Sequence, residues 1–166
     1  AEPILARAEV NEKRASRGEK TANAIWLWGS GRALRLESLA EKYGFNGGVI
    51  SAVDLVRGIG QSAGLDVIDV PGITGYLDTN YEGKAQAALR VLERDNFVYV
   101  HVEAPDEAGH EGDVRAKKQA IEDFDARVVG PLLKGLDSLG PCRILMTPDH
   151  RTPIALRTHS REPVPF

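Results

Sequence analysis

Five aspartate and histidine residues lie close behind two apolar, strand-like segments of the sequence, residues 97–100 and 143–146. Asp106 and His110 stand four residues apart, a spacing that lets a carboxylate and an imidazole converge on one cation if this loop makes a helical turn. Parallel-sheet proteins place their chemistry at the carboxyl ends of strands, so we expect a divalent-metal site here. The candidate ligands are Asp106, His110, Asp149, His150 and His159.

The pattern of these ligands favours two metal ions. Asp149 and His150 are adjacent, and neighbouring side chains in extended backbone point in opposite directions, so we expect them to face different ions. Two ions about 4 Å apart are typical of phosphoryl-transfer sites. Mixed carboxylate and imidazole ligation suits Mn²⁺ or Zn²⁺, and also Mg²⁺ if more oxygen ligands take part. Asp106, His110 and His159 would serve one ion, whereas the other pair alone is too small a ligand set.

Three basic residues are candidates for binding an anionic substrate. Arg32 follows a strand-like run and a glycine-containing turn, where an arginine could bind phosphate or carboxylate, or could simply be exposed. Arg57 and Lys84 lie in segments with helical patterns, and a surface role is the alternative for Arg57. His101 ends the same strand that precedes Asp106, and we expect it to support the site from outside or to be structural.

The composition indicates a soluble globular domain. The chain has 166 residues, of which 42% are hydrophobic and 27% charged, and a net charge of −3. The charge shows no basic excess that would indicate nucleic acid or an anionic membrane as a partner. No apolar stretch approaches the roughly 20 residues that a helix needs to cross a bilayer. Cys142 is the single cysteine, which excludes an internal disulfide and favours a reducing, cytoplasmic setting. The first residues show neither a signal-peptide pattern nor a Met, which suggests processing or a piece of a larger protein.

Apolar runs and helical periodicities alternate along the chain and predict an α/β fold with a mostly parallel sheet and crossover helices. Residues 1–23 are polar and predict a linker or connecting segment, followed by one domain over residues 24–166. Strands are expected at residues 24–28, 48–53, 66–70, 97–100 and 143–146. Helices are expected at residues 33–43, 55–63, 79–95 and 113–139.

Local signals fix some boundaries of these helices. Asp54 is the expected N-cap of the helix that starts at residue 55. Thr79 and Glu82 fit a capping box at the start of the next helix. Pro131 is expected to kink or split the longest helix, because proline lacks the N–H and its ring clashes with the preceding turn.

Several motifs together resemble the cofactor-independent phosphoglycerate mutases of the alkaline phosphatase superfamily. The runs DxxxH at residues 106–110, TPDH at 147–150 and THSREPVPF at 158–166 carry the resemblance to the family. The runs NAIWLWGSGR, GVISAVDLVRGIG, GYLDTNYEGKA and FVYVHVEAPDEAGH are similar to its archaeal-type branch in particular. The resemblance extends along essentially the whole chain.

The resemblance implies a reaction and a division of the ligands. Members of the family interconvert 3-phosphoglycerate and 2-phosphoglycerate through a phosphoserine enzyme and two divalent metals, without 2,3-bisphosphoglycerate. For this chain we expect Mn²⁺ as the metal, with Mg²⁺ or Zn²⁺ as alternatives. By resemblance, Asp106, His110 and His159 would hold one metal, and Asp149 and His150 would help to hold the other. The implied partner is a small phosphoglycerate substrate in the cytoplasm, with the oligomeric state left open.

The sequence departs from the family in lacking its nucleophilic serine, one metal-binding aspartate and its inserted substrate-binding domain. We therefore expect the C-terminal part of a protein more than twice as long, inactive as a mutase by itself. Two alternatives stay open. One is another member of the superfamily, such as a phosphopentomutase or a phosphomonoesterase, and the other is a non-catalytic module that kept the fold.

Overall fold

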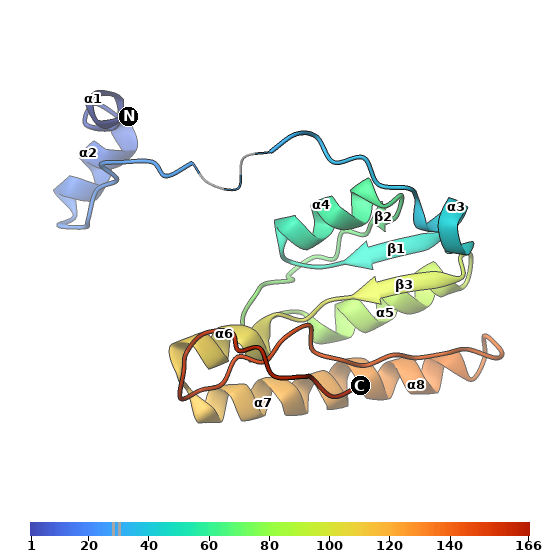
Figure 1. Ribbon diagram of the computed structural model, residues 1–166. Helices are drawn as coiled ribbons and strands as arrows, with labels where there is room; N and C mark the ends of the chain where they lie inside the picture. Colours follow the sequence, from blue (N-terminus) through green and yellow to red (C-terminus); the bar gives the residue numbers. More distant parts are fainter. Residues whose placement is uncertain (28, 30) are drawn as a thin grey trace. The chain divides into compact units, whose positions relative to one another are not determined.

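The computed structural model describes residues 1–27, 29 and 31–166, which divide into two compact units, Ala1–Leu34 and Arg35–Phe166 (Figure 1). The first unit contains two short helices, α1 (Glu2–Leu5) and α2 (Glu9–Ser16). The amide of Asn11 fastens the following segment to them. It donates to the carbonyls of Leu5 at 2.8 Å and Ala22 at 2.7 Å, and it accepts from the Ala22 N–H at 2.9 Å. The predicted domain boundary after residue 23 stays a prediction.

The prediction of a strand at residues 24–28 is wrong for residues 24–27, the part that the structure describes. Residues 24–27 are irregular, and the side chains of Ile25, Trp26 and Leu27 are exposed. Trp28, the end of the predicted strand, lies outside the described residues. An apolar run becomes a strand only where another strand pairs with its N–H and C=O groups, and these described residues have no such ladder.

A parallel sheet forms the centre of the second unit. Its described strands are β1 (Gly47–Ile50), β2 (Asp66–Val67) and β3 (Phe97–Val100), in the order β2-β1-β3. Both pairings are parallel, with Gly48 opposite Asp66 and Ile50 opposite Val100. This confirms the predicted α/β class, with β1 and β2 shorter than expected.

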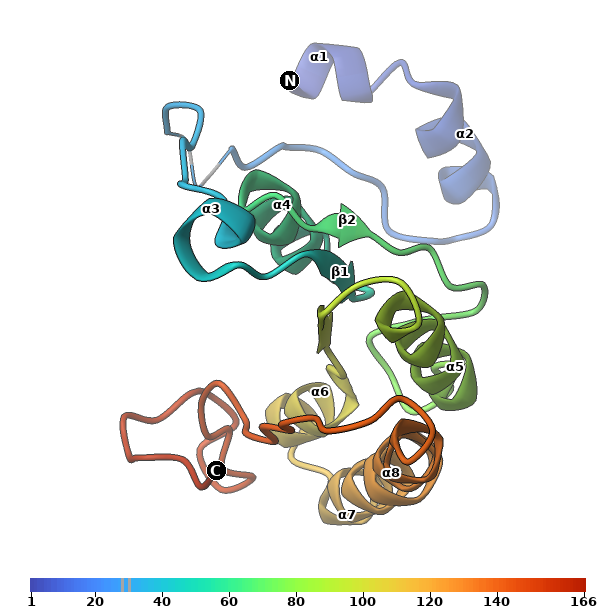
Figure 2. The same cartoon turned by 90° about the vertical axis from the view of Figure 1, so that its right-hand side faces the viewer.

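Helices pack on the sheet and extend beyond one edge. Figure 2 shows α4 (Asp54–Ser62) and α5 (Tyr81–Leu92) on opposite faces. Small residues of α5 let it approach the sheet closely, and its buried Ala87 and Ala88 pack with Ile50 and Val70. The other described helices are α3 (Leu39–Tyr43), α6 (Ala104–Glu111), α7 (Val114–Phe124), the π-helical η1 (Asp125–Val129) and α8 (Gly130–Leu136).

The helix predicted at 113–139 is split, as Pro131 suggested. The π-helical segment η1 separates α7 from α8, and Pro131 lies in the first turn of α8. The N–H of Gly130 donates to the Asp125 carbonyl, five residues back. This wider turn precedes the proline, whose ring would otherwise clash with the carbonyl four residues before it.

Two predicted caps are displaced by one residue. Asn80, not Thr79, caps α5, and its side chain accepts from the Gly83 N–H at 2.8 Å. The Thr79 hydroxyl accepts instead from the Thr74 N–H at 3.0 Å, within the preceding loop. Asp54 lies inside the first turn of α4 and makes no cap bond. The cap of α5 therefore lies one residue after the predicted position, whereas the N-cap position of α4 is Val53, one residue before Asp54.

Two further predictions are wrong: one helix begins later than expected, and one strand is not formed by the residues predicted for it. Helix α3 starts at Leu39 instead of residue 33, because Ser38 and Glu41 form a capping box there. Residues 143–146 are irregular and exposed in place of the predicted strand, with no partner ladder in the described chain.

The segment after β3 differs from the loop predicted there. It is the helix α6, with Pro105 in its first turn, where a missing N–H costs no hydrogen bond. No helix in the described part of the chain is long and apolar enough to span a membrane.

Candidate metal centre

Helix α6 places Asp106 and His110 on one of its faces. The His110 Nε2 lies 3.2 Å from the Asp106 Oδ2, one helical turn apart. The side chain of Asp106 is 22% exposed, so its carboxylate is held at the surface of the unit with limited access to water. The helical turn on which the predicted pairing depended is present.

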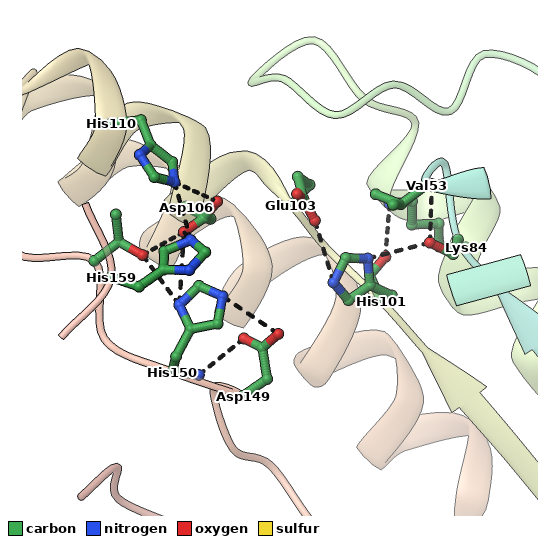
Figure 3. Close-up of polar contacts among 11 residues, drawn as sticks. Val53, Lys84, His101, Glu103, Asp106, His110, Asp149, His150 and His159 are labelled. Carbon is green, nitrogen blue, oxygen red and sulfur yellow. Dashed lines mark hydrogen bonds and ion pairs between the residues drawn. The ribbon is translucent and has the colours of Figure 1, made fainter. Parts of the chain in front are cut away.

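The C-terminal segment brings two more histidines to this face. Arg151 and Ser160 form an isolated antiparallel bridge, in which the Ser160 N–H donates to the Arg151 carbonyl at 3.0 Å. The bridge holds the flanking His150 and His159 side by side, with ring centroids 3.6 Å apart. The His159 Nε2 lies 3.6 Å from the Asp106 Oδ1 (Figure 3).

The hydrogen-bond partners of His110 fix which ring nitrogen carries the proton. Its Nδ1 lies 3.0 Å from the Arg157 carbonyl, which only accepts, so Nδ1 donates. The lone pair of Nε2 therefore faces the Asp106 carboxylate and the His159 Nε2, 3.1 Å away. Histidines that bind metals commonly donate their other N–H to a backbone carbonyl in this way. Arg157 itself has φ 54°, uncommon for a residue other than glycine and frequent near functional sites.

Thr152 connects the two halves of the centre. Its buried hydroxyl donates to the Asp106 Oδ1, and its oxygen lies 3.2 Å from the His150 Nδ1. Because the hydroxyl proton is used on the carboxylate, the oxygen accepts from the His150 Nδ1–H, which leaves His150 Nε2 as an acceptor. That Nε2 lies 3.5 Å from the Asp149 Oδ2. The Lys117 ammonium donates to the Thr152 carbonyl at 2.6 Å and holds this segment on α7.

Potential ligand atoms thus converge where the sequence predicted a cation. One ligand atom each from Asp106, His150 and His159 lies within 4.8 Å of the others. Glu103, Asp106 and Glu107 form a second such group. Nitrogen and oxygen donors of this kind fit Mn²⁺ or Zn²⁺. Burial, then the charges of Asp106 and Glu107, raises the pKa of the Glu103 carboxyl.

Of the three predicted anion-binding residues, two already have polar partners, and the third belongs to the first unit of the chain. The Arg57 guanidinium pairs with Asp69 at 2.8 Å. Lys84 is fully buried, and its ammonium donates to the His101 carbonyl at 2.8 Å. Arg32 is exposed and belongs to the first unit, and Ser30 of its predicted turn lies outside the described residues.

Sequence reasoning missed Thr152 and Glu103. The signal for Thr152 was a hydroxyl residue two positions after His150 in the run TPDHRT. Glu103 stands three residues before Asp106, so the helical start of α6 brings the two carboxylates near one another. Glu103 could not be assigned without knowing that α6 begins at Ala104, and Thr152 could not be assigned without knowing that the C-terminal segment packs against Asp106.

A sequence profile of the metalloenzyme superfamily matches residues 7–166, nearly the whole chain. The chain belongs to this superfamily. It is 62% identical over 154 residues to a probable 2,3-bisphosphoglycerate-independent phosphoglycerate mutase of Geobacter sulfurreducens, covering 93% of this chain and 39% of the relative. It is 56% identical over 164 residues to the 2,3-bisphosphoglycerate-independent phosphoglycerate mutase of Methanosarcina acetivorans, covering 98% and 41%.

The fold has a counterpart among solved structures. The PH0037 protein of Pyrococcus horikoshii superimposes with a TM-score of 0.81 and 28% identity, over 98% of this chain and 42% of that one. These findings confirm the predicted resemblance to archaeal-type mutases and the α/β class. The chain spans about two-fifths of the length of these relatives. Membership of the superfamily implies use of a divalent metal.

Proposed function

We propose that this chain carries the divalent-metal centre of an enzyme that interconverts 3-phosphoglycerate and 2-phosphoglycerate without 2,3-bisphosphoglycerate. The observation that carries the proposal is the convergence of potential ligand atoms from Asp106, His150 and His159 beside His110. The His110 Nε2 lone pair faces the Asp106 Oδ2 at 3.2 Å, an arrangement that a cation bound to both atoms would stabilise. The mutase names of the curated relatives supply the reaction.

The ligands would divide between two ions. Asp106, His110 and His159 would hold one, an assignment supported by the Nε2 lone pair of His110 that faces the other two side chains. Asp149 and His150 would contribute to the second. The 3.5 Å between Oδ2 and Nε2 favours one shared ion for this pair, in place of the different ions expected for neighbouring side chains in extended backbone. Bound divalent ions would stabilise charge on the transferred phosphoryl group and activate a hydroxyl. We propose Mn²⁺ as the ion, with Mg²⁺ or Zn²⁺ as alternatives.

We place the nucleophilic serine outside these 166 residues. Ser160 adjoins His159, but its hydroxyl donates to the Glu162 carboxylate. The phosphoserine step would therefore need a serine from another part of the enzyme, and this chain alone is expected to show no turnover.

Three cations remain our candidates for the substrate's charges. Arg32 is exposed, and Arg57 could exchange Asp69 for a phosphate or carboxylate. Lys84 would reach an anion only by leaving the His101 carbonyl, which makes it the weakest of the three.

A coupled assay tests the proposal. Formation of 2-phosphoglycerate from 3-phosphoglycerate is followed with Mn²⁺ and no 2,3-bisphosphoglycerate, on this chain and on the longest natural reading frame that contains it. We expect activity in the long form alone, lost in its Asp149→Asn variant and kept in Asp137→Asn, an exposed control at the end of α8.

Two results would contradict the proposal. Turnover by this chain alone would show that the nucleophile has been misplaced. A silent long form that still binds Mn²⁺ would exclude the mutase and direct attention to phosphopentomutase or phosphomonoesterase substrates.

A further inference from the structure

A buried serine and a histidine meet where two neighbouring strands end. Ile50 and Val100 are the last paired residues of β1 and β3, and Ser51 and His101 follow them directly. The His101 N–H donates to the Ile50 carbonyl at 2.8 Å, which continues the ladder by one bond. This register places the Ser51 hydroxyl oxygen 3.1 Å from the His101 Nδ1. Ser51 has no exposed surface.

The other ring nitrogen of His101 reaches a carboxylate. Its Nε2 lies 3.2 Å from the Glu103 Oε2 (Figure 3). An ionised carboxylate only accepts, so Nε2 carries the proton. Burial and the nearby Lys84 ammonium lower the pKa of His101, which favours the neutral ring. Its Nδ1 then accepts from the Ser51 hydroxyl, whose oxygen accepts in turn from the Val53 N–H at 3.0 Å.

This series of polar contacts, from Ser51 through His101 to Glu103, ends beside the metal centre. An oxygen of Glu103 lies within 4.8 Å of oxygens of Asp106 and Glu107. In Figure 3 Glu103 lies between His101 and Asp106. Two carboxylates at this distance repel one another, so a free Glu103 side chain would turn towards water. The N–H of His101 opposes this movement.

We propose that Ser51 and His101 are positioning residues that hold the Glu103 carboxylate beside Asp106, where its charge strengthens cation binding. The inference rests on the metal centre proposed above. Ser51 fixes the proton of His101 on Nε2, and that N–H fixes Glu103. The trio is not a hydrolytic triad, because Ser51 is fully buried and its oxygen is already bonded to the Val53 N–H.

The test uses the full chain and two independent readouts. ¹⁵N shifts of the imidazole report which nitrogen of His101 carries the proton, and calorimetric titration reports Mn²⁺ affinity. We expect a proton on Nε2 in the wild type and a mixture of tautomers in Ser51→Ala, with Mn²⁺ bound about tenfold more weakly. Ser62→Ala is the matched control, since its exposed hydroxyl donates to the Gly58 carbonyl within its own helix, and its affinity should stay within about twofold.

A second variant separates charge from shape. Glu103→Gln keeps an oxygen that can accept from His101 but removes the charge, so we expect the Nε2 proton to remain while Mn²⁺ affinity falls about tenfold. A wild-type ring protonated on Nδ1, or both variants binding Mn²⁺ like the control, would overturn the proposal. Asp106→Asn separates the two claims. If it weakens binding while Ser51→Ala and Glu103→Gln do not, only the positioning role is wrong, whereas no effect of Asp106→Asn removes the metal centre as well.

Discussion

The buried ammonium of Lys84 should make the stability of the protein depend on pH in the alkaline range. Lys84 has no exposed surface, and burial lowers its pKa from 10.5 to about 8, an effect opposed by the charge of Glu103. Because the unfolded chain holds this proton more tightly, the charge costs about 3 kcal/mol of unfolding free energy at neutral pH.

The sign of the effect follows from proton binding. Below about pH 8 both states carry the proton, and the cost is fully present. Between about pH 8 and 10.5 the unfolded state binds more protons than the folded state, so stability rises with pH. Over the interval from about pH 7 to pH 9 the expected gain from this one group is about 1 kcal/mol.

Urea unfolding of the wild type and of Lys84→Met at these two pH values isolates the contribution of the Lys84 ammonium to the unfolding free energy. Methionine has a similar length and no charge, and its failure to donate to the His101 carbonyl destabilises the fold equally at both values. We expect the wild type to gain about 1 kcal/mol relative to the variant on going to the higher pH. Lys118→Met, at an exposed ion pair with Glu122, should follow the wild type. If Lys84→Met and the wild type change in parallel, the ammonium is not buried as described.

Two substitutions test the packing around the site and the core. Gly112→Ala would place a Cβ 2.4 Å from the Arg157 Nε and should weaken Mn²⁺ binding severalfold in calorimetry, because the Arg157 carbonyl orients a ligand. Gly44→Ala has a similar φ in open space and should cost only backbone strain, so equal losses of affinity in the two variants would refute this reasoning. Ile50→Ala should lower the unfolding free energy by about 2–5 kcal/mol in urea, since the side chain is fully buried. Leu55→Ala, at an exposed position, should change it by less than about 0.5 kcal/mol, and a similar cost at both positions would contradict the assigned core.

The parts of the fold that the sequence predicted are those where local pattern and tertiary packing agree. The run at Phe97–Val100 is apolar and β-branched, and β1 supplies the partner that makes it a strand. The runs at 24–28 and 143–146 are also largely apolar, but the described residues give them no partner ladder. Strand formation depends on a neighbour that a local pattern does not reveal.

The sequence indicated the candidate ligands of the site but not the contacts between them. Asp106 and His110 could be paired from their spacing, because a helical turn has a fixed period. The contact of His159 with Asp106 spans 53 positions and depends on the bridge between Arg151 and Ser160. His101 was expected to support the site or to be structural, and its contacts with Ser51 and Glu103 follow only from strand register and the start of α6.

Titration of the chain with Mn²⁺, followed by the electron paramagnetic resonance signal of the free ion, tests the metal centre most directly. The account predicts saturable binding that Asp106→Asn weakens at least about tenfold, because this carboxylate contacts three of the four other candidate ligands. Asp125→Asn, an exposed aspartate in η1, should leave the binding curve unchanged. Identical curves for the wild type and Asp106→Asn would contradict the central claim that this cluster holds a cation.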